Sequence, residues 1–185
     1  MLVDLKECKI CVIGLGYVGL PLAVEFAKKY PVIGFDTNVK RIDELRSGVD
    51  RNLEFDENDD IVRNITFETD IRKLKQANVY IVTVPTPVDE NNIPDLTMLR
   101  EASTLVGELL DLDNLVIYES TVYPSVTEDV CVPLLSTVSG LEYNRDFFVG
   151  YSPERINPGD KTRKLSQIVK VTSGSTYEAS VFIDS

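Results

Sequence analysis

Hydrophobic and polar residues follow one another along the chain as short apolar runs and longer amphipathic stretches. A short apolar run predicts a buried β-strand, and apolar residues three or four positions apart predict a helix. The predicted strands cover residues 9–13, 31–36, 65–69, 78–85, 114–121, 146–153 and 167–174. The predicted helices cover residues 18–29, 39–46, 71–75, 96–110 and 126–135. Apolar strands separated by helices indicate an α/β fold: a Rossmann-like, doubly wound, mainly parallel sheet with helices on both faces.

Two of the predicted helices begin near residues that commonly cap helices. Asp95, in the stretch PDLTML, is placed to act as the N-cap of the helix at 96–110. Ser125 and Glu128 have the spacing of a capping box, in which the serine and glutamate side chains each accept a hydrogen bond from a free backbone N–H. We therefore expect Ser125 to cap the helix at 126–135.

A glycine-rich turn joins the first predicted strand to the first predicted helix. Gly14, Gly16 and Gly19 form the pattern G-x-G-x-x-G. In a dinucleotide-binding turn the first glycine permits the tight turn, the second lets the backbone approach a pyrophosphate, and the third lets helix and strand pack closely. The free N–H groups and partial positive charge at the helix start would then bind the phosphates.

Asp36 ends the second predicted strand. A carboxylate there can accept hydrogen bonds from the adenosine ribose hydroxyls and would repel a 2′-phosphate. Arg41 follows five residues later; it could bind a 2′-phosphate, or it could lie over the adenine side of the cofactor. We predict NAD rather than NADP. The alternative is that the glycines only form a turn and that Asp36 only caps a helix.

Charge and hydropathy narrow the class of protein further. The 185 residues carry a net charge of −11, which argues against nucleic acid or an anionic membrane surface as a partner. No apolar run reaches the roughly 18 residues that suggest a membrane-spanning helix. The N-terminal stretch MLVDLKECK lacks the apolar core of a signal peptide. These features predict a cytoplasmic protein.

The chain has three cysteines and no histidine, and the odd number fits a reducing compartment without a disulfide framework. Cys8 and Cys11 lie three positions apart at the first predicted strand, so their side chains should point to opposite faces and cannot share a metal. We interpret both, and Cys131 in a later helix, as structural thiols and expect no metal site. The acidic run at 55–60 is interpreted as a solvated surface loop.

Four further stretches narrow the kind of dinucleotide-binding protein: GYVGLPLA at 16–23, VPTP at 84–87, YESTVYP at 118–124 and GYSPERINPGD at 150–160. In this order and spacing they resemble the UDP-glucose/GDP-mannose dehydrogenase family of nucleotide-sugar 6-dehydrogenases. The last stretch resembles the branch that oxidises UDP-N-acetylhexosamines (UDP-GlcNAc or UDP-GalNAc) for surface polysaccharides. The resemblance covers essentially the whole chain.

The resemblance implies an enzyme larger than this chain. Members of the family are more than twice as long, with the NAD-binding half first, then a long central helix that generally builds the dimer, then a UDP-sugar-binding half. They oxidise the C6 alcohol of the sugar to the uronate in two NAD-dependent steps, through a thioester on a cysteine in the later part. Residues 1–185 are therefore expected to be a single NAD-binding domain, truncated from an enzyme that is a homodimer or larger, and to bind NAD without turnover.

The resemblance also assigns cofactor contacts to individual positions. The adenosine-ribose contacts correspond to Asp36 and Arg41, and Thr86 corresponds to a further contact with NAD. The pyrophosphate turn corresponds to Gly14, Gly16, Tyr17, Val18 and Gly19.

Four more positions are expected near the reacting centre. Thr121 matches a threonine near the nicotinamide that helps to position a catalytic water. Glu154 matches a glutamate between cofactor and substrate with a proposed acid/base or water-orienting role, and Arg155 and Ile156 match contacts with the sugar nucleotide. Without the resemblance, Thr86 and Thr121 would be loop residues that satisfy nearby backbone groups. Glu154 and Arg155 would be a surface ion pair.

One position departs from the family pattern. The stretch YPSVTE has Ser125 after the proline, where the family usually has a glycine. Serine can replace glycine at a helix start at little cost, but not where a ligand must approach the backbone closely. The departure affects the expected geometry around Thr121 and not the expected fold.

Two other classes of protein share the glycine turn. The first is a stand-alone NAD(H)-binding sensor or regulatory module, and the substrate-facing stretch at 150–160 counts against it. The second is the cofactor domain of a 3-hydroxyacyl or 6-phosphogluconate dehydrogenase. Those families use catalytic motifs of their own, which this chain lacks.

Overall fold

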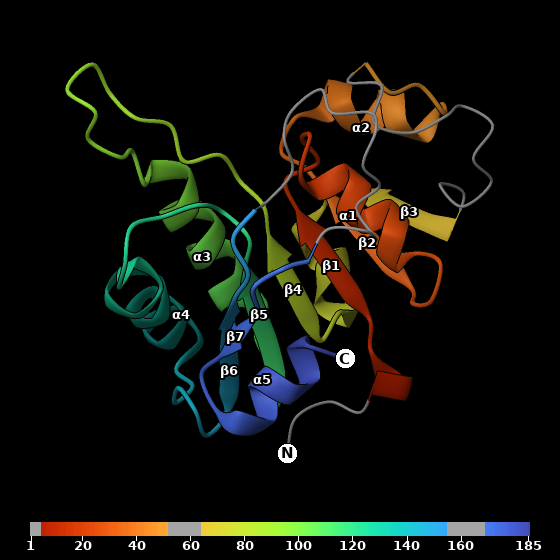
Figure 1. Cartoon of the computed structure of the whole chain (residues 1–185). Coiled ribbons are helices and arrows are strands. Elements are labelled where there is room, and N and C mark those ends of the chain that lie inside the picture. Colours follow the sequence, from red (N-terminus) through yellow and green to blue (C-terminus); the bar gives the residue numbers. More distant parts are fainter. Residues whose placement is uncertain (1–4, 52–63, 155–168) are drawn as a thin grey trace.

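A seven-stranded sheet forms the centre of the computed structural model, which describes residues 5–51, 64–154 and 169–185 (Figure 1). The strand order is β3-β2-β1-β4-β5-β6-β7. The first six strands in this order are parallel to their neighbours, and β7 is antiparallel to β6. The strands are β1 (Ile10–Ile13), β2 (Val32–Phe35), β3 (Ile65–Glu68), β4 (Val79–Val82), β5 (Asn114–Tyr118), β6 (Phe147–Tyr151) and β7 (Ser173–Gly174).

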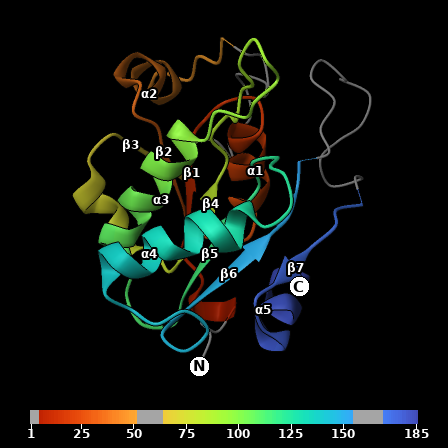
Figure 2. The ribbon, with the colours of Figure 1, turned by 90° about the vertical axis from the view of Figure 1, so that its left-hand side faces the viewer.

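Helices cover both faces of the sheet, as the alternation of apolar runs and helical stretches predicts. In Figure 2, α3 and α4 lie next to each other on the face toward the viewer, with the sheet behind them. The α-helices are α1 (Gly19–Phe26), α2 (Val39–Arg46), α3 (Thr97–Leu109), α4 (Val132–Ser139) and α5 (Tyr177–Ile183). Shorter helices are the 3₁₀ turns Leu5–Glu7 and Ile71–Gln76 and the π-helix Thr127–Cys131. The predicted fold class is confirmed.

Two apolar cores form on the two faces, because successive residues of a strand point in opposite directions. Val12 of β1 belongs to the core that includes side chains of α1, α2 and α5. Cys11 and Ile13 of the same strand belong to the core that includes side chains of α3 and α4. Among the described residues, no helix combines the length and the apolar character that crossing a membrane requires.

The three thiols are buried in these cores, as predicted. Cys8 lies in the first core and Cys11 in the second, so the sheet separates them. Cys131 is buried in the second core. Burial raises the pKa of Cys8 to about 11, and it also raises the pKa of Cys11 and of Cys131.

The strands are shorter than the apolar runs that predict them. β4 ends at Val82 and β5 ends at Tyr118, although the predicted strands extend to residue 85 and residue 121. The extra residues leave the sheet at the carboxyl ends of these strands. The strand predicted at 167–174 is reduced to Ser173–Gly174 within the described part of the chain, and residues 167 and 168 lie outside it. The acidic run at 55–60 also lies outside the described residues.

The predicted capping box at Ser125 is wrong. Ser125 has a φ of 71°, the left-handed conformation, and the helical segment begins at Thr127 without a side-chain cap. Its first part is a π-helix, in which the N–H of Val132 donates to the carbonyl of Thr127 five residues earlier. Pro133 follows at the start of α4 and has no N–H with which to continue an α-helical ladder. The helix predicted at 126–135 is therefore a π-turn followed by α4, which extends to Ser139.

Asp95 accepts a hydrogen bond from the first turn of the helix, as predicted, but it lies one residue before the N-cap position. The helix α3 begins at Thr97, so Leu96 occupies the N-cap position. The Oδ1 atom of Asp95 nevertheless accepts a hydrogen bond of 2.9 Å from the N–H of Thr97. Hydrogen bonding from Thr97, through its side chain and its N–H, holds the pKa of the Asp95 carboxyl below its usual value.

The left-handed conformation of Ser125 predicts that Ser125→Gly stabilises the fold. A side chain in this region of backbone space is strained, whereas glycine is not. Since glycine also loses more chain entropy on folding, we expect a net gain of about 0.5–1 kcal/mol, measured by urea unfolding. Ser125→Ala is the matched control and should give no gain, because alanine carries the same strain. Equal effects of both changes would contradict this explanation.

The burial of the thiols predicts slow reaction with Ellman's reagent. The thiolate is the reactive form, and a raised pKa makes it scarce at pH 8. We expect no rapid reaction of the native chain and release of three equivalents in denaturant, one for each cysteine. Fast reaction of a single equivalent in the native chain would show that one of these sites opens readily.

Candidate functional site

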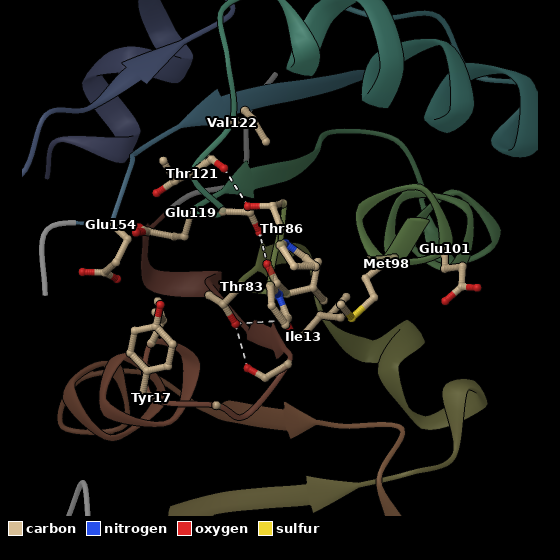
Figure 3. Close-up of a pocket in the computed structure, with 18 of the residues that line it drawn as sticks. Ile13, Tyr17, Thr83, Thr86, Met98, Glu101, Glu119, Thr121, Val122 and Glu154 are labelled. Atoms are coloured by element: carbon tan, nitrogen blue, oxygen red, sulfur yellow. Dashed lines mark hydrogen bonds between the residues drawn. The ribbon is translucent and has the colours of Figure 1, made fainter. Parts of the chain in front are cut away.

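A cavity of about 810 Å³ lies at the carboxyl ends of the central strands (Figure 3). The strand order changes direction between β1 and β4, and such a switch point is where open α/β sheets bind their ligands. In Figure 3, Tyr17 and Glu154 lie at one end of the cavity, and Met98 and Glu101 lie at the other. The cavity is lined by residues at the carboxyl ends of β1, β2, β4 and β5, by side chains of α3, and by Glu154 after β6.

The glycine turn forms one wall of this cavity, and two of its glycines have different structural roles. A Cβ on Gly19 would lie 1.9 Å from the carbonyl oxygen of Gly14 and 2.4 Å from Oγ1 of Thr83. Gly19 therefore permits α1 to start directly against the turn, which is the role expected of the third glycine. A Cβ on Gly16 would meet no atom within 4 Å, and Gly16 lines the cavity. The space at Gly16 is thus open to a ligand.

Thr83, which sequence reasoning did not identify, holds the turn to β4. Its Oγ1 lies 2.9 Å from the carbonyl oxygen of Ile13 and 2.7 Å from that of Gly14, and its single hydroxyl proton is shared between them. Its N–H donates to the carbonyl of Ile13 at 2.9 Å. The signal for Thr83 is positional: it is the first residue after β4, beside the glycine turn in the sheet order.

Asp36 lines the cavity, and its carboxylate is fixed by two backbone groups. The N–H of Leu15 donates to Oδ2 at 2.9 Å, and the N–H of Asn38 donates to Oδ1 at 2.8 Å. The cap of α2 is Asn38, whose Oδ1 accepts a hydrogen bond from the N–H of Arg41 at 3.2 Å. The carboxylate of Asp36 thus joins the glycine turn to the end of β2 and still faces the cavity.

Arg41 lies behind the turn. The residue is only 5% exposed, and it does not line the cavity. Its Nε donates to the carbonyl of Leu15 at 3.0 Å, and its guanidinium forms an ion pair of 2.7 Å with Asp50. Asp36 and Arg41 thus hold the two polar backbone groups of Leu15 from opposite sides. A direct contact between Arg41 and the cofactor stays a prediction.

Tyr17 and Val18 also line the cavity, and the ring of Tyr17 is about half exposed. The two predicted threonines lie on neighbouring loops, and Oγ1 of Thr86 donates to the carbonyl of Thr121 at 2.7 Å (Figure 3). A parallel bond of 2.6 Å joins Oγ of Ser120 to the carbonyl of Val84. The loops after β4 and β5 are therefore fastened to each other where they border the cavity. Thr86 has the backbone-bonding role that threonines in loops commonly have, and this role leaves its contact with NAD untested.

A second acid, Glu119, lies beside Glu154 in the cavity wall and was not identified from the sequence. Glu119 directly follows β5, is buried, and forms an ion pair with Lys170. Burial raises the pKa of Glu119, and the charge of Lys170 opposes this rise. The N–H of Glu154 donates to the main-chain carbonyl of Glu119 at 3.3 Å. Arg155 and Ile156, the expected sugar-nucleotide contacts, lie outside the described residues.

A parallel sheet in this order, with a glycine turn and an acid after the second strand at its switch point, defines a dinucleotide-binding Rossmann-type domain. Residues 8–182 match the NAD binding domain of the UDP-glucose/GDP-mannose dehydrogenase family, and the chain belongs to this family. The resemblance inferred from the motifs is confirmed, and NAD is the cofactor of this domain.

Individual relatives support the same placement. A UDP-N-acetyl-D-glucosamine 6-dehydrogenase of Pseudomonas aeruginosa is 56% identical over 98% of this chain and 43% of its own length. Protein CapL of Staphylococcus aureus is 53% identical over 91% of this chain and 40% of its own. The structure of a UDP-D-ManNAc dehydrogenase from Pyrococcus horikoshii superposes with a TM-score of 0.86 at 34% identity, over 95% of this chain and 43% of that one. The chain thus spans less than half the length of these relatives.

The different surroundings of two glycines predict different effects of adding a methyl group. Gly19→Ala places a Cβ against the Gly14 carbonyl, so we expect a loss of about 2–3 kcal/mol in the free energy of unfolding. Gly16→Ala has room in the free chain and should change stability by no more than about 0.5 kcal/mol. The new methyl group would occupy the space at the cavity, so NAD binding should weaken at least about tenfold.

Urea unfolding and calorimetric titration with NAD measure the two effects of these alanine substitutions separately. Normal NAD affinity in a stable Gly16→Ala chain would contradict the role given to Gly16.

Proposed function

We propose that this chain is the NAD-binding half of an enzyme that oxidises the C6 alcohol of a UDP-N-acetylhexosamine to the uronate in two NAD-dependent steps. The observation that carries the proposal is the cavity at the switch point, which opens at Gly16 and Asp36 and extends to Thr121 and Glu154. The named activity of the Pseudomonas aeruginosa relative supports the substrate class. Bound NAD would accept the hydride in each oxidation step.

The order of the strands supports an orientation for the cofactor. Asp36 follows β2, the glycine turn follows β1, and the loops that carry Thr86 and Thr121 follow β4 and β5. Because these strands lie in the order β2-β1-β4-β5, the lining residues are spread in that order along the cavity. With the ribose of adenosine on Asp36 and the pyrophosphate at the start of α1, the nicotinamide would lie by the loops after β4 and β5.

The residues at the nicotinamide end supply positioning and proton-transfer groups. Thr121 is exposed on its loop, and the bond from Thr86 to its carbonyl fixes the backbone there. Its hydroxyl would help to hold a water molecule. Glu154, in the same wall, would act on that water or on the sugar as an acid or base. Arg155 and Ile156 would continue this wall toward the sugar nucleotide.

The cysteines of this chain do not supply the nucleophile that the second oxidation step needs. Cys8, Cys11 and Cys131 are buried in the apolar cores, burial raises their pKa values, and none of them lines the cavity. We place the nucleophile and most of the sugar-binding site in a part of the enzyme beyond this domain. We also place the whole enzyme in the cytoplasm and expect a homodimer or larger assembly.

The proposal predicts that the purified chain binds NAD and has no dehydrogenase activity. Calorimetric titration should give one site per chain, with NAD bound at least about tenfold more tightly than NADP, because Asp36 repels the 2′-phosphate. No NADH should form when UDP-GlcNAc or UDP-GalNAc is added with NAD. Gly16→Ala is the control for binding at the cavity. Failure to bind NAD, or steady NADH production by the pure chain, would overturn the proposal.

A further inference from the structure

We propose that Arg41 is a positioning residue for the cofactor: from behind the glycine turn, it holds the peptide between Leu15 and Gly16 so that the N–H of Gly16 faces the pyrophosphate. This inference rests on the proposed function, because it uses the place given there to the pyrophosphate, at the start of α1. The family resemblance assigns Arg41 to the adenosine ribose, whereas this role is directed at the phosphates.

The guanidinium of Arg41 is buried behind the turn. Its Nε donates to the carbonyl of Leu15 at 3.0 Å, and its Nη1 lies 2.7 Å from a carboxylate oxygen of Asp50. The two side chains of this ion pair are 6% and 2% exposed, and neither residue is among those that line the cavity. In this position the guanidinium acts on the backbone of the turn and not directly on a ligand in the cavity.

The geometry of the peptide carries the effect of this bond to the cavity side of the turn. The peptide between Leu15 and Gly16 is trans, and in a trans peptide the carbonyl and the N–H point in opposite directions. Because the carbonyl points back to Arg41, the N–H of Gly16 points forward, and Gly16 lines the cavity. Within the described part of the chain, this N–H donates to no group. It is therefore available to a phosphate oxygen.

This peptide needs a support more than the one before it does. A peptide flips at little cost when the residue after it accepts a positive φ, and glycine does so. The preceding peptide of the turn is fixed on both sides: Oγ1 of Thr83 lies 2.7 Å from its carbonyl oxygen, and its N–H donates to Asp36 at 2.9 Å. The peptide that ends at Gly16 is fixed, among the described residues, at its carbonyl by Arg41 alone. Arg41 thus restricts the freedom that Gly16 introduces.

Two parts of the cofactor should respond differently to this bond. ADP and adenosine share the adenine and the ribose, and they differ in the diphosphate, which is the group that would reach the turn. An N–H that is already oriented in the free chain favours binding of the diphosphate, because binding then need not order the peptide. The dissociation constant of adenosine divided by that of ADP reports this contribution and cancels effects on the shared adenosine.

The substitution R41K removes the bond to Leu15 and keeps the positive charge. A methylene group of lysine takes the position of the arginine Nε and cannot donate, while the terminal ammonium can still pair with Asp50. We expect ADP to bind about fivefold more weakly, the loss typical of one hydrogen bond. Adenosine should bind as before, so the ratio should fall by the same factor. A direct contact of Arg41 with the ribose would instead weaken both ligands and leave the ratio unchanged.

Arg46 offers a matched control on the same helix, α2. Its Nε and Nη2 also donate to a backbone carbonyl, that of Phe67, at 3.1 and 2.8 Å, and its guanidinium pairs with Glu68 at 3.2 Å. These bonds hold β3 and not the glycine turn, and Arg46 is not among the residues that line the cavity. R46K therefore removes the same kind of bond and should leave the ratio unchanged.

Calorimetry with ADP, and competition of adenosine against ADP, measure both dissociation constants on the 185-residue chain. Thermal unfolding first establishes that each variant is folded. A lower ratio in R41K, with no change in R46K, would establish the role of Arg41. An unchanged ratio in R41K, or an equal fall in both variants, would overturn it. An unsubstituted chain that binds neither ADP nor NAD would instead refute the proposed function.

If R41K does not fold, a crystal structure of the unsubstituted chain with ADP decides. The expected structure keeps Nε of Arg41 on the carbonyl of Leu15 and places the N–H of Gly16 within hydrogen-bond distance of a phosphate oxygen. A guanidinium turned toward the ribose, or an N–H of Gly16 that points away from the phosphates, would overturn the proposal.

Discussion

The close approach of Gly19 to the carbonyl of Gly14 is the contact on which the site depends. It lets α1 begin directly at the end of β1, and the hydroxyl of Thr83 binds the same carbonyl from β4. Three elements thus meet at one peptide group. Because that peptide is held from behind, the turn can leave the space in front of Gly16 open without collapsing into it. The cavity is a consequence of this packing.

Hydrogen bonds between side chains and backbone groups tie the rest of the cavity wall together in the same way. Leu15 is held by Asp36 and Arg41, and the loops after β4 and β5 are joined by the bond from Thr86 to Thr121. Side chains that the family resemblance assigns to cofactor contacts therefore also hold the frame of the site. Replacing one of them would change both the frame and the contact, so loss of binding alone would not identify a ligand contact. A substitution such as Gly16→Ala, which leaves the frame intact, distinguishes the two.

The apolar pattern predicts the order of elements well, because burial on both faces of a parallel sheet depends on the sequence of each segment. The bounds of α2 agree with the predicted helix at 39–46. The pattern fails at the ends of β4 and β5, where the predicted strands continue past Val82 and Tyr118 into residues that leave the sheet and line the cavity. It also fails at Ser125, where the capping pattern is present but the left-handed backbone and Pro133 determine the local structure. The glycine turn can be recognised from the sequence because the residues that form it are close together in the chain. The ion pair of Glu119 cannot be recognised in this way, because its partner Lys170 lies 51 residues away and meets it only in the folded chain.

The cavity and the apolar cores of this domain hold different kinds of reactive group. This domain presents hydroxyls, carboxylates and backbone N–H groups at its cavity, and these groups can bind, orient and exchange protons. Its thiols lie in the apolar cores, where burial raises their pKa values and the sheet separates Cys8 from Cys11. In the proposed function, the domain would hold the cofactor with its nicotinamide end toward Glu154, and a covalent intermediate would need a nucleophile from outside this domain.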